Sequence, residues 1–112
     1  MKLALVGISH HRAPVELREQ VAVELDGATA IARSLAGDCE AVVLSTCNRT
    51  EIYLAADEDH QFDARATNAL VLLAEERGEE ISPVLYRLAD ESAALHLFRV
   101  AAGLDSLVPG EG

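Results

Sequence analysis

Two short apolar segments that flank a polar turn restrict the fold of this chain more than any other feature. The first, residues 40–45, reads as a strand, and so does the second, residues 50–55. Residues 46–49 separate the two segments, which is the length of a tight turn. Cys47 is therefore expected at the tip of this turn, beside a hydroxyl, an amide and a guanidinium.

A cysteine in this position has two possible roles. Many cysteines in loops are incidental, and structural ones are usually buried among apolar residues. Cysteines that react lie exposed near positive charge, which favours the thiolate, and Arg49 supplies such a charge here. The pattern alone leaves open both an unreactive turn cysteine and a nucleophile.

The rest of the chain predicts an α+β fold. Further strands are expected at residues 3–8 and 84–88, and helices are expected from Pro14, from Asp26 as N-cap, over about residues 60–77, and from Asp90 or Glu91. This order, β-α-α-β-β-α-β-α, fits a ferredoxin-like two-layer sandwich, in which an antiparallel sheet carries its helices on one face. One helix of that fold would be split here, and one terminal helix added.

The final helix is expected to bury one apolar stripe. Its members recur at helical spacing and are Ala94, Leu97, Phe98 and Ala101. His96 would lie away from this stripe, on the face of Ser92 and Arg99, where it is available for chemistry. A histidine near a helix start is also often structural, so both roles stay open.

Composition narrows the class of protein. Half of the 112 residues are apolar, which suffices for one domain with its own core. Cys39 and Cys47 have neither the number nor the spacing of a zinc site or a disulfide framework. The apolar start is too short for a signal peptide, and no segment reaches the ~20 apolar residues of a membrane span. These features predict a soluble, cytoplasmic protein with no metal and no membrane contact.

Three segments of the chain resemble glutamyl-tRNA reductase, in that family's order. The turn and its second strand read STCNRTEIY over residues 45–53. The opening reads LVGISHHRAPV over residues 5–15, and the closing segment reads HLFRVAAGLDSLVPGEG over residues 96–112. The resemblance implies a member of this family, which acts early in tetrapyrrole and haem synthesis, and it implies the ferredoxin-like fold of the family's N-terminal catalytic domain.

The resemblance also implies a reaction and its residues. Cys47 would be the nucleophile that attacks the glutamyl ester of glutamyl-tRNA to form a thioester, which the full-length family reduces with NADPH to glutamate-1-semialdehyde. His96 would be catalytic, as the acid or base. Arg49 would bind the side-chain carboxylate of the glutamyl group, unless it is a surface arginine paired with Glu51 or Asp57. The remaining substrate-binding positions would be Thr46, Asn48, Ser106 and Glu111, of which the first two could equally stabilise the turn.

The domain limits follow from the same comparison of patterns. Residues 1–104 are expected to form the catalytic domain, and residues 105–112 the start of a connection to C-terminal domains that are absent here. No GxGxxG motif is present, so NADPH would bind outside this chain. The resemblance implies a homodimer of the full-length protein, formed largely through a helix outside this chain, so this piece is expected to be mainly monomeric. It also implies the next enzyme of the pathway as a partner of the full-length protein.

The charge of the chain is unusual for a partner of tRNA. Its 19 acidic and 9 basic residues give a net charge of -10, although phosphate contacts dominate nucleic-acid affinity. Either the RNA contacts lie mostly outside this domain, or the host cytoplasm is salty. Two other functions stay open: a non-catalytic module that binds glutamyl-tRNA or a protein, and a thiol-dependent esterase.

Overall fold

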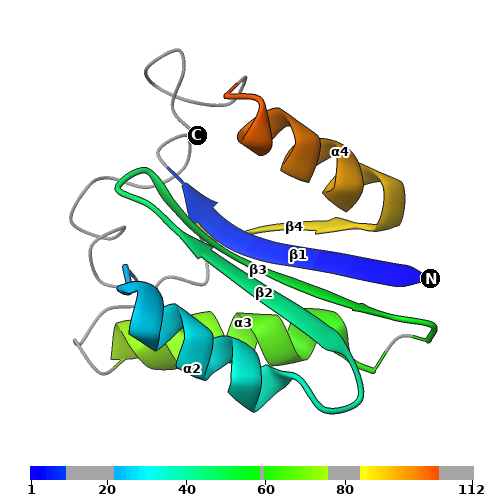
Figure 1. Ribbon diagram of the computed structural model, residues 1–112, viewed down its shortest axis with the longest axis horizontal. Coiled ribbons are helices and arrows are strands. Elements are labelled where there is room, and N and C mark those ends of the chain that lie inside the picture. The colour runs from blue at the N-terminus through cyan, green and yellow to red at the C-terminus, as the bar shows by residue number, and fades with distance from the viewer. Residues whose placement is uncertain (10–21, 59, 76–83, 104–112) are drawn as a thin grey trace.

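The structure, a computed structural model, describes residues 1–9, 22–58, 60–75 and 84–103. Four strands form one antiparallel sheet in the order β2-β3-β1-β4 (Figure 1). They are β1 (Lys2–Ser9), β2 (Glu40–Ser45), β3 (Arg49–Ala56) and β4 (Tyr86–Ala89). With one helical crossover between β1 and β2 and another between β3 and β4, this is the ferredoxin-like order, so the predicted α+β class is confirmed.

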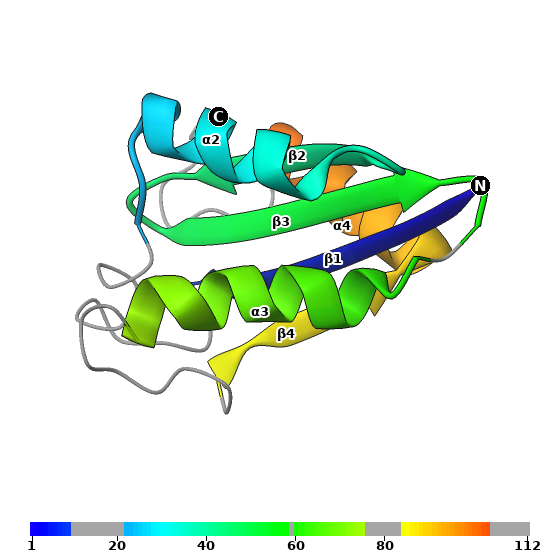
Figure 2. The same ribbon diagram turned by 90° about the horizontal axis from the view of Figure 1, so that it is seen from below.

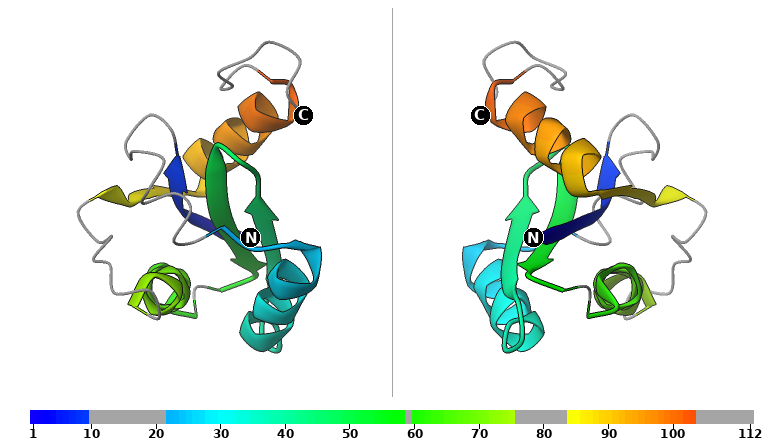
Figure 3. Two further views of the ribbon diagram at one scale, coloured as in Figure 1. Left: turned by 90° about the vertical axis from the view of Figure 1, so that its left-hand side faces the viewer. Right: turned by 90° about the vertical axis from the view of Figure 1, so that its right-hand side faces the viewer.

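Helices cover both faces of this sheet. Helices α2 (Leu25–Leu35) and α3 (Phe62–Glu75) lie side by side on one face, and α4 (Asp90–Ala101) lies on the opposite face (Figures 2 and 3). The two-layer part of the prediction holds for α2 and α3, whereas the expectation of helices on one face does not hold for the added helix α4. The physical reason is that both faces of the central strands need covering, because every residue of β1 from Leu5 to Ser9 is buried.

The main core lies between the sheet and α2 and α3. Alternate residues of the central strands point into it, as expected for a strand with period two. The largest fully buried members are Val6, Ile8, Ile52, Leu54, Phe62 and Leu70. A smaller cluster on the α4 face contains Leu5, Tyr53 and Ala93. The two clusters together fix the face to which each side chain of β1 and β3 belongs.

Most predicted elements are confirmed with small shifts at their ends. The strand at 40–45 is observed with these bounds, and its partner starts one residue earlier and ends one residue later than predicted. Asp26 does not cap α2, because the helix begins at Leu25 with Glu24 at the N-cap; the Asp26 carboxylate instead lies in the first turn, near the positive end of the helix dipole. The strand predicted from residue 84 begins at Tyr86. The helix predicted from Pro14 lies outside the described residues.

Candidate functional site

The hairpin between β2 and β3 presents Cys47 at its tip, as predicted. The strands pair up to Ser45 and Thr50, and the backbone N–H of Thr46 then donates to the carbonyl of Arg49 at 2.7 Å. Cys47 and Asn48 remain as the two residues of the turn. The Cys47 side chain is exposed, which is the placement that a reactive thiol requires.

Thr46 serves the turn itself. Its hydroxyl oxygen accepts a hydrogen bond from the backbone N–H of Asn48 at 3.2 Å. One pair further down the strands, the hydroxyls of Ser45 and Thr50 lie 2.9 Å apart, and the Ser45 hydroxyl also accepts from the backbone N–H of Val23. These bonds support the turn-stabilising role for Thr46, and they hold the cysteine-bearing tip against the segment that precedes α2.

On the α4 face of the sheet, a buried carboxylate gathers four donors. Glu51 has no exposed surface, and its Oε1 accepts from the Tyr53 hydroxyl at 2.8 Å. Its Oε2 accepts from the Tyr86 hydroxyl, from Nε2 of His96 at 2.6 Å, and from Nη1 of Arg49 at 3.4 Å. An ionised carboxylate only accepts, so the tautomer of His96 that suits an ionised Glu51 carries its proton on Nε2 and leaves Nδ1 as the other ring nitrogen. We call these five residues the Glu51 cluster.

Strand periodicity explains how β3 contributes to this cluster. Arg49, Glu51 and Tyr53 are alternate residues, so their side chains leave the same face of the sheet. Residues 50, 52 and 54 point to the other face, and Ile52 and Leu54 belong to the main core. A polar face and an apolar face thus share one strand, and the polar face begins two residues after Cys47.

Arg49 is buried, unlike the surface arginine of the alternative reading. Its side chain is only 2 % exposed and pairs with Glu51, so the partner named in the surface-pair alternative is correct but the position is buried. Asn48 is likewise buried. A guanidinium held in a buried site two residues from an exposed thiol remains compatible with binding a carboxylate there.

His96 lies on the inner face of α4, and the predicted stripe is wrong. The buried residues of this helix are Ala93 and Val100, which with His96 follow helical spacing, whereas Leu97 and Phe98 are 41 % and 74 % exposed. The reason is that the sheet beneath α4 presents the Glu51 carboxylate, which the imidazole can satisfy and a leucine cannot. His96 does share a shallow pocket with Ser92 and Arg99, as its predicted face implied.

The structure therefore brings Arg49 and His96 together on the carboxylate of Glu51, a residue that follows Cys47 closely in the chain. The sequence pattern indicates Glu51 only as a surface partner of Arg49 and contains no direct sign that Tyr53 or Tyr86 belongs to the site. The signals that were available are the alternation of β3 and the glycine at position 7 inside a strand, a residue that often marks a close approach. Ser106 and Glu111, and residues 105–112 as a whole, lie outside the described residues.

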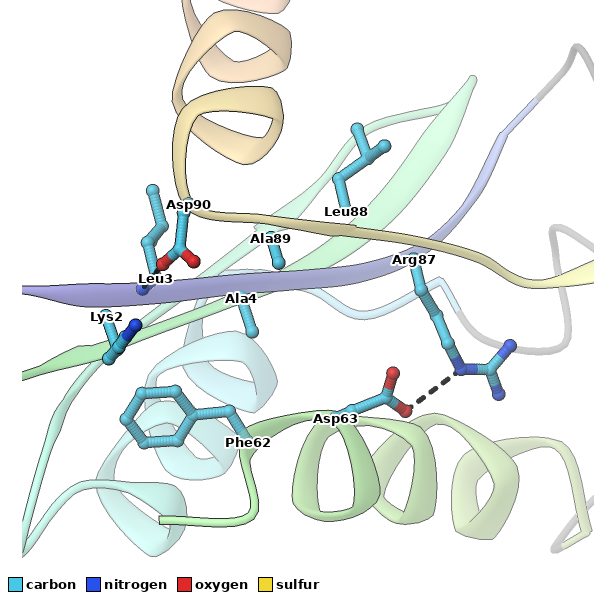
Figure 4. A pocket seen from close by; sticks show the side chains of 9 residues that line it. All are labelled: Lys2, Leu3, Ala4, Phe62, Asp63, Arg87, Leu88, Ala89 and Asp90. Carbon is cyan, nitrogen blue, oxygen red and sulfur yellow. Dashed lines mark hydrogen bonds and ion pairs between the residues drawn. The ribbon is translucent and has the colours of Figure 1, made fainter. Parts of the chain in front are cut away.

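A second pocket lies at the start of β1 (Figure 4). Its walls come from the start of β1, the start of α3 and β4, and the Asp63 carboxylate and the Arg87 guanidinium within it form an ion pair at 3.0 Å. It contains none of the predicted site residues. Because Lys2 pairs with Ala56 while Ser9 pairs with Arg49, this pocket lies at the opposite end of the sheet from the hairpin tip.

Two absences concern the described residues alone. Among them there is no group of three or more His, Cys, Asp or Glu side chains placed to hold a metal ion. No helix within the described ranges is long and apolar enough to cross a bilayer.

Comparison with known proteins gives a consistent result. Residues 6–112 match the family model described as "Glutamyl-tRNAGlu reductase, N-terminal domain". The chain is 43 % identical to glutamyl-tRNA reductase 1 of Nocardioides sp., over 100 % of this chain and 27 % of the relative, and 46 % identical to glutamyl-tRNA reductase of Chromohalobacter salexigens, over 99 % and 26 %. It thus spans about a quarter of the length of these curated relatives.

A solved structure shows the same similarity. It is glutamyl-tRNA reductase from Methanopyrus kandleri, which superposes with a TM-score of 0.59 at 31 % identity. The match covers 94 % of this chain and 23 % of that structure. The described architecture is therefore similar to one domain of a longer enzyme.

Proposed function

This chain belongs to the glutamyl-tRNA reductase family, as its N-terminal domain, and on that premise we propose that it performs the acyl-transfer half of a glutamyl-tRNA reductase reaction. The observation that carries the proposal is the exposed thiol of Cys47. Two residues further along the chain lies the buried Arg49, and Arg49 and His96 both bind Glu51. A thiol, a cation and a proton carrier are what an acyl transfer to sulfur needs.

Cys47 is the nucleophile in this proposal. Its sulfur attacks the carbonyl carbon of the glutamyl ester, and the bond from that carbon to the ribose oxygen of tRNA breaks. The ribose oxygen takes up a proton and leaves as an alcohol, while the glutamyl group stays on sulfur as a thioester. A thioester is more electrophilic than an oxygen ester, which prepares the acyl group for reduction.

His96 carries the proton in this reaction. With Nε2 held by Glu51 at 2.6 Å, the ring is oriented and Nδ1 is available to take the thiol proton and return it to the leaving oxygen. Glu51 is then a positioning residue that fixes the imidazole, in the way a buried carboxylate orients a histidine base in hydrolases. His96 has 17 % of its side chain exposed, so the ring is reachable from outside.

Arg49 binds the side-chain carboxylate of the glutamyl group in this proposal. The distance of 3.4 Å between Arg49 and Glu51 is the longest of the four hydrogen bonds to Glu51. If Arg49 turns to bind a ligand, Glu51 therefore keeps its three other donors. A planar guanidinium binds a carboxylate through two parallel hydrogen bonds. Thr46, Asn48, Ser106 and Glu111 complete the substrate-binding residues by their positions in the family motif.

Reduction belongs to other parts of a full-length enzyme. The family's cofactor is NADPH, but the described residues form an antiparallel sheet without the glycine-rich strand-to-helix turn that holds a dinucleotide phosphate. The residues present do not fit that cofactor, so the proposed chemistry of this chain stops at the thioester. In the complete protein we place this domain in a cytoplasmic homodimer of tetrapyrrole synthesis, with the next enzyme of the pathway as a partner.

The intact mass of the chain, measured after mixing with glutamyl-tRNA and quenching in acid, tests this function. A glutamyl adduct is expected on the unchanged chain and on Cys39→Ser, but not on Cys47→Ser. Cys39 is the matched control because it is the only other cysteine of the chain. It lies in the connection between α2 and β2, away from the hairpin turn, and its thiol donates to the carbonyl of Leu35 at the end of α2. Release of glutamate without an adduct would indicate an esterase, and binding of tRNA with neither signal would indicate a recognition module.

A further inference from the structure

We propose that Tyr86 is a positioning residue of this site and that the missing side chain of Gly7 is what admits it. The proposal rests on the function proposed above and deepens it. In it, the Tyr86 hydroxyl fixes one oxygen of Glu51, and that oxygen in turn fixes the ring of His96. The position of the proton carrier is thereby set from β4, at the far edge of the sheet.

The geometry of the sheet puts these residues in one row. Glu51 of β3 is opposite Gly7 of β1, and Gly7 is opposite Tyr86 of β4. Strands in a sheet are about 4.8 Å apart, so β3 and β4 are separated by about twice that distance. Side chains two strands apart meet only if the residue between them leaves room.

Gly7 leaves that room. A Cβ atom at position 7 would lie 2.9 Å from Cγ of Glu51, 2.9 Å from the hydroxyl oxygen of Tyr86 and 3.0 Å from its Cζ. These distances are shorter than a Cβ atom tolerates without movement of its neighbours, of which Glu51 is fully buried and Tyr86 is half-buried. Because a glycine inside a strand costs stability, its presence here is explained by the contact that forms above it.

Tyr86 acts as a donor throughout the range in which enzymes work. Burial, and after it the negative charge of Glu51, raise the pKa of Tyr86 far above its ordinary value of 10.0, so the hydroxyl keeps its proton. It donates to Oε2 of Glu51, the same oxygen that binds Nε2 of His96. Its ring also lies against the imidazole, with centroids 5.6 Å apart and planes tilted by 55°.

The two tyrosines divide the carboxylate between them. Tyr53 holds Oε1 and Tyr86 holds Oε2, so the carboxylate group cannot rotate without breaking a hydrogen bond. With the carboxylate fixed, the imidazole ring of His96 has one orientation in which Nε2 meets its acceptor, Oε2 of Glu51. Tyr86 contacts both the oxygen that accepts from His96 and the imidazole ring, whereas the Tyr53 hydroxyl donates to the other oxygen, and this difference provides a matched pair of variants.

The first test compares Tyr86→Phe with Tyr53→Phe in nitrogen NMR spectra of the histidine side chains. The chain has four histidines, and His96→Gln identifies the signals of His96. We expect Tyr86→Phe to shift or broaden the His96 ring signals clearly more than Tyr53→Phe does, because only the Tyr86 hydroxyl binds the oxygen that accepts from His96. Unchanged His96 signals in Tyr86→Phe would overturn the proposal.

Kinetics of adduct formation give a second readout that a purely structural role would not produce. At saturating glutamyl-tRNA, Tyr86→Phe is expected to lower the rate constant roughly ten-fold, with KM unchanged within about two-fold. A rise in KM alone would overturn the proposal, because it would mean that Tyr86 serves binding. If the unchanged chain forms no adduct, the proposed function fails, and the NMR comparison still decides the role of Tyr86.

A double-mutant cycle keeps the proposal testable if one variant folds poorly. Gly7→Ala is expected to destabilise the chain strongly, and its cost should be smaller in the Tyr86→Phe background, where the clashing hydroxyl is gone. The free energies of unfolding in urea give the coupling. Equal costs of Gly7→Ala in both backgrounds would show that Gly7 and Tyr86 are independent, and would overturn their link.

Discussion

At the scale of single residues, the site is built around a carboxylate rather than around the thiol. Glu51 is completely buried, and its charge is compensated by donors from β3, β4 and α4. A buried charge is stable only when it is paired and hydrogen-bonded, so the cluster and the fold depend on each other. Three structural elements are joined at this one side chain.

Replacement of Glu51 by glutamine should therefore be costly although the shape is kept. The amide NH₂ group would face donors, and the guanidinium of Arg49 would lose this carboxylate. We expect Glu51→Gln to lower the free energy of unfolding by about 3 kcal/mol. Urea denaturation followed by circular dichroism measures it.

Tyr53→Phe is the matched control, since it removes one hydrogen bond from a neutral donor and leaves the charge of Glu51 in place. Its expected cost is about 1.5 kcal/mol, the lower end for a hydrogen bond to a charged group. Equal costs for the two variants would contradict the view that the charge of Glu51, and not only its hydrogen bonds, holds the cluster together.

At the scale of elements, a charged contact joins the end of α2 to the start of α3. Nη1 of Arg65 donates to the Asp38 carboxylate at 3.0 Å, and Nη2 donates to the carbonyl of Leu35 at the end of α2 at 2.5 Å. A hydrogen bond from Arg65, and then its charge, hold the pKa of Asp38 below its ordinary value of 3.8. This contact fixes how the two helices lie on their shared face.

The lowered pKa gives the contact a defined pH dependence. A carboxylate whose pKa is lower in the folded state stabilises that state above about pH 4, and this contribution is lost as the pH falls through the folded-state pKa. Asp38→Asn should therefore lower Tm at neutral pH, and the difference in Tm from the unchanged chain should close as the pH falls through the folded-state pKa of Asp38. Calorimetry over this range measures it, and a constant difference would refute the assignment.

The elements also show what the sequence could reveal. The hairpin is predictable because its strands are apolar, alternate and separated by a clear turn. The buried face of α4 is not predictable in this way, because apolar residues occur on nearly all sides of the helix, from Ala93 to Ala101. Which of them is buried depends on the sheet beneath, where the Glu51 carboxylate selects His96. Periodicity cannot report a polar contact between residues 45 positions apart.

At the scale of the whole molecule, α4 leaves an apolar surface uncovered. Leu95 and Phe98 are 56 % and 74 % exposed and lie three residues apart, so they share one side of the helix. Such surfaces commonly mark contacts or cause association. The chain spans about a quarter of the length of its relatives. In spite of the exposed apolar side chains of α4, we expect it to be mainly monomeric.

Phe98→Gln tests what this surface does. Because Phe98 is exposed and glutamine favours helices, the free energy of unfolding should change by less than about 0.5 kcal/mol. Val100→Gln, two residues along on the buried side, should cost several times more. Light scattering on the same samples measures association: a stable dimer of the unchanged chain would refute the monomer, and its loss in Phe98→Gln would locate the contact on α4.

The position of β3 has a consequence for how the molecule unfolds. This strand carries Arg49, Glu51 and Tyr53, follows directly after the Cys47 turn, and is paired on both edges, with β2 and with β1. Amides of such a strand exchange with solvent water only when the sheet opens as a unit. We therefore expect hydrogen exchange at Ile52 to report global unfolding, so that Arg49, Glu51 and Tyr53 lose their arrangement on β3 only when the whole domain unfolds.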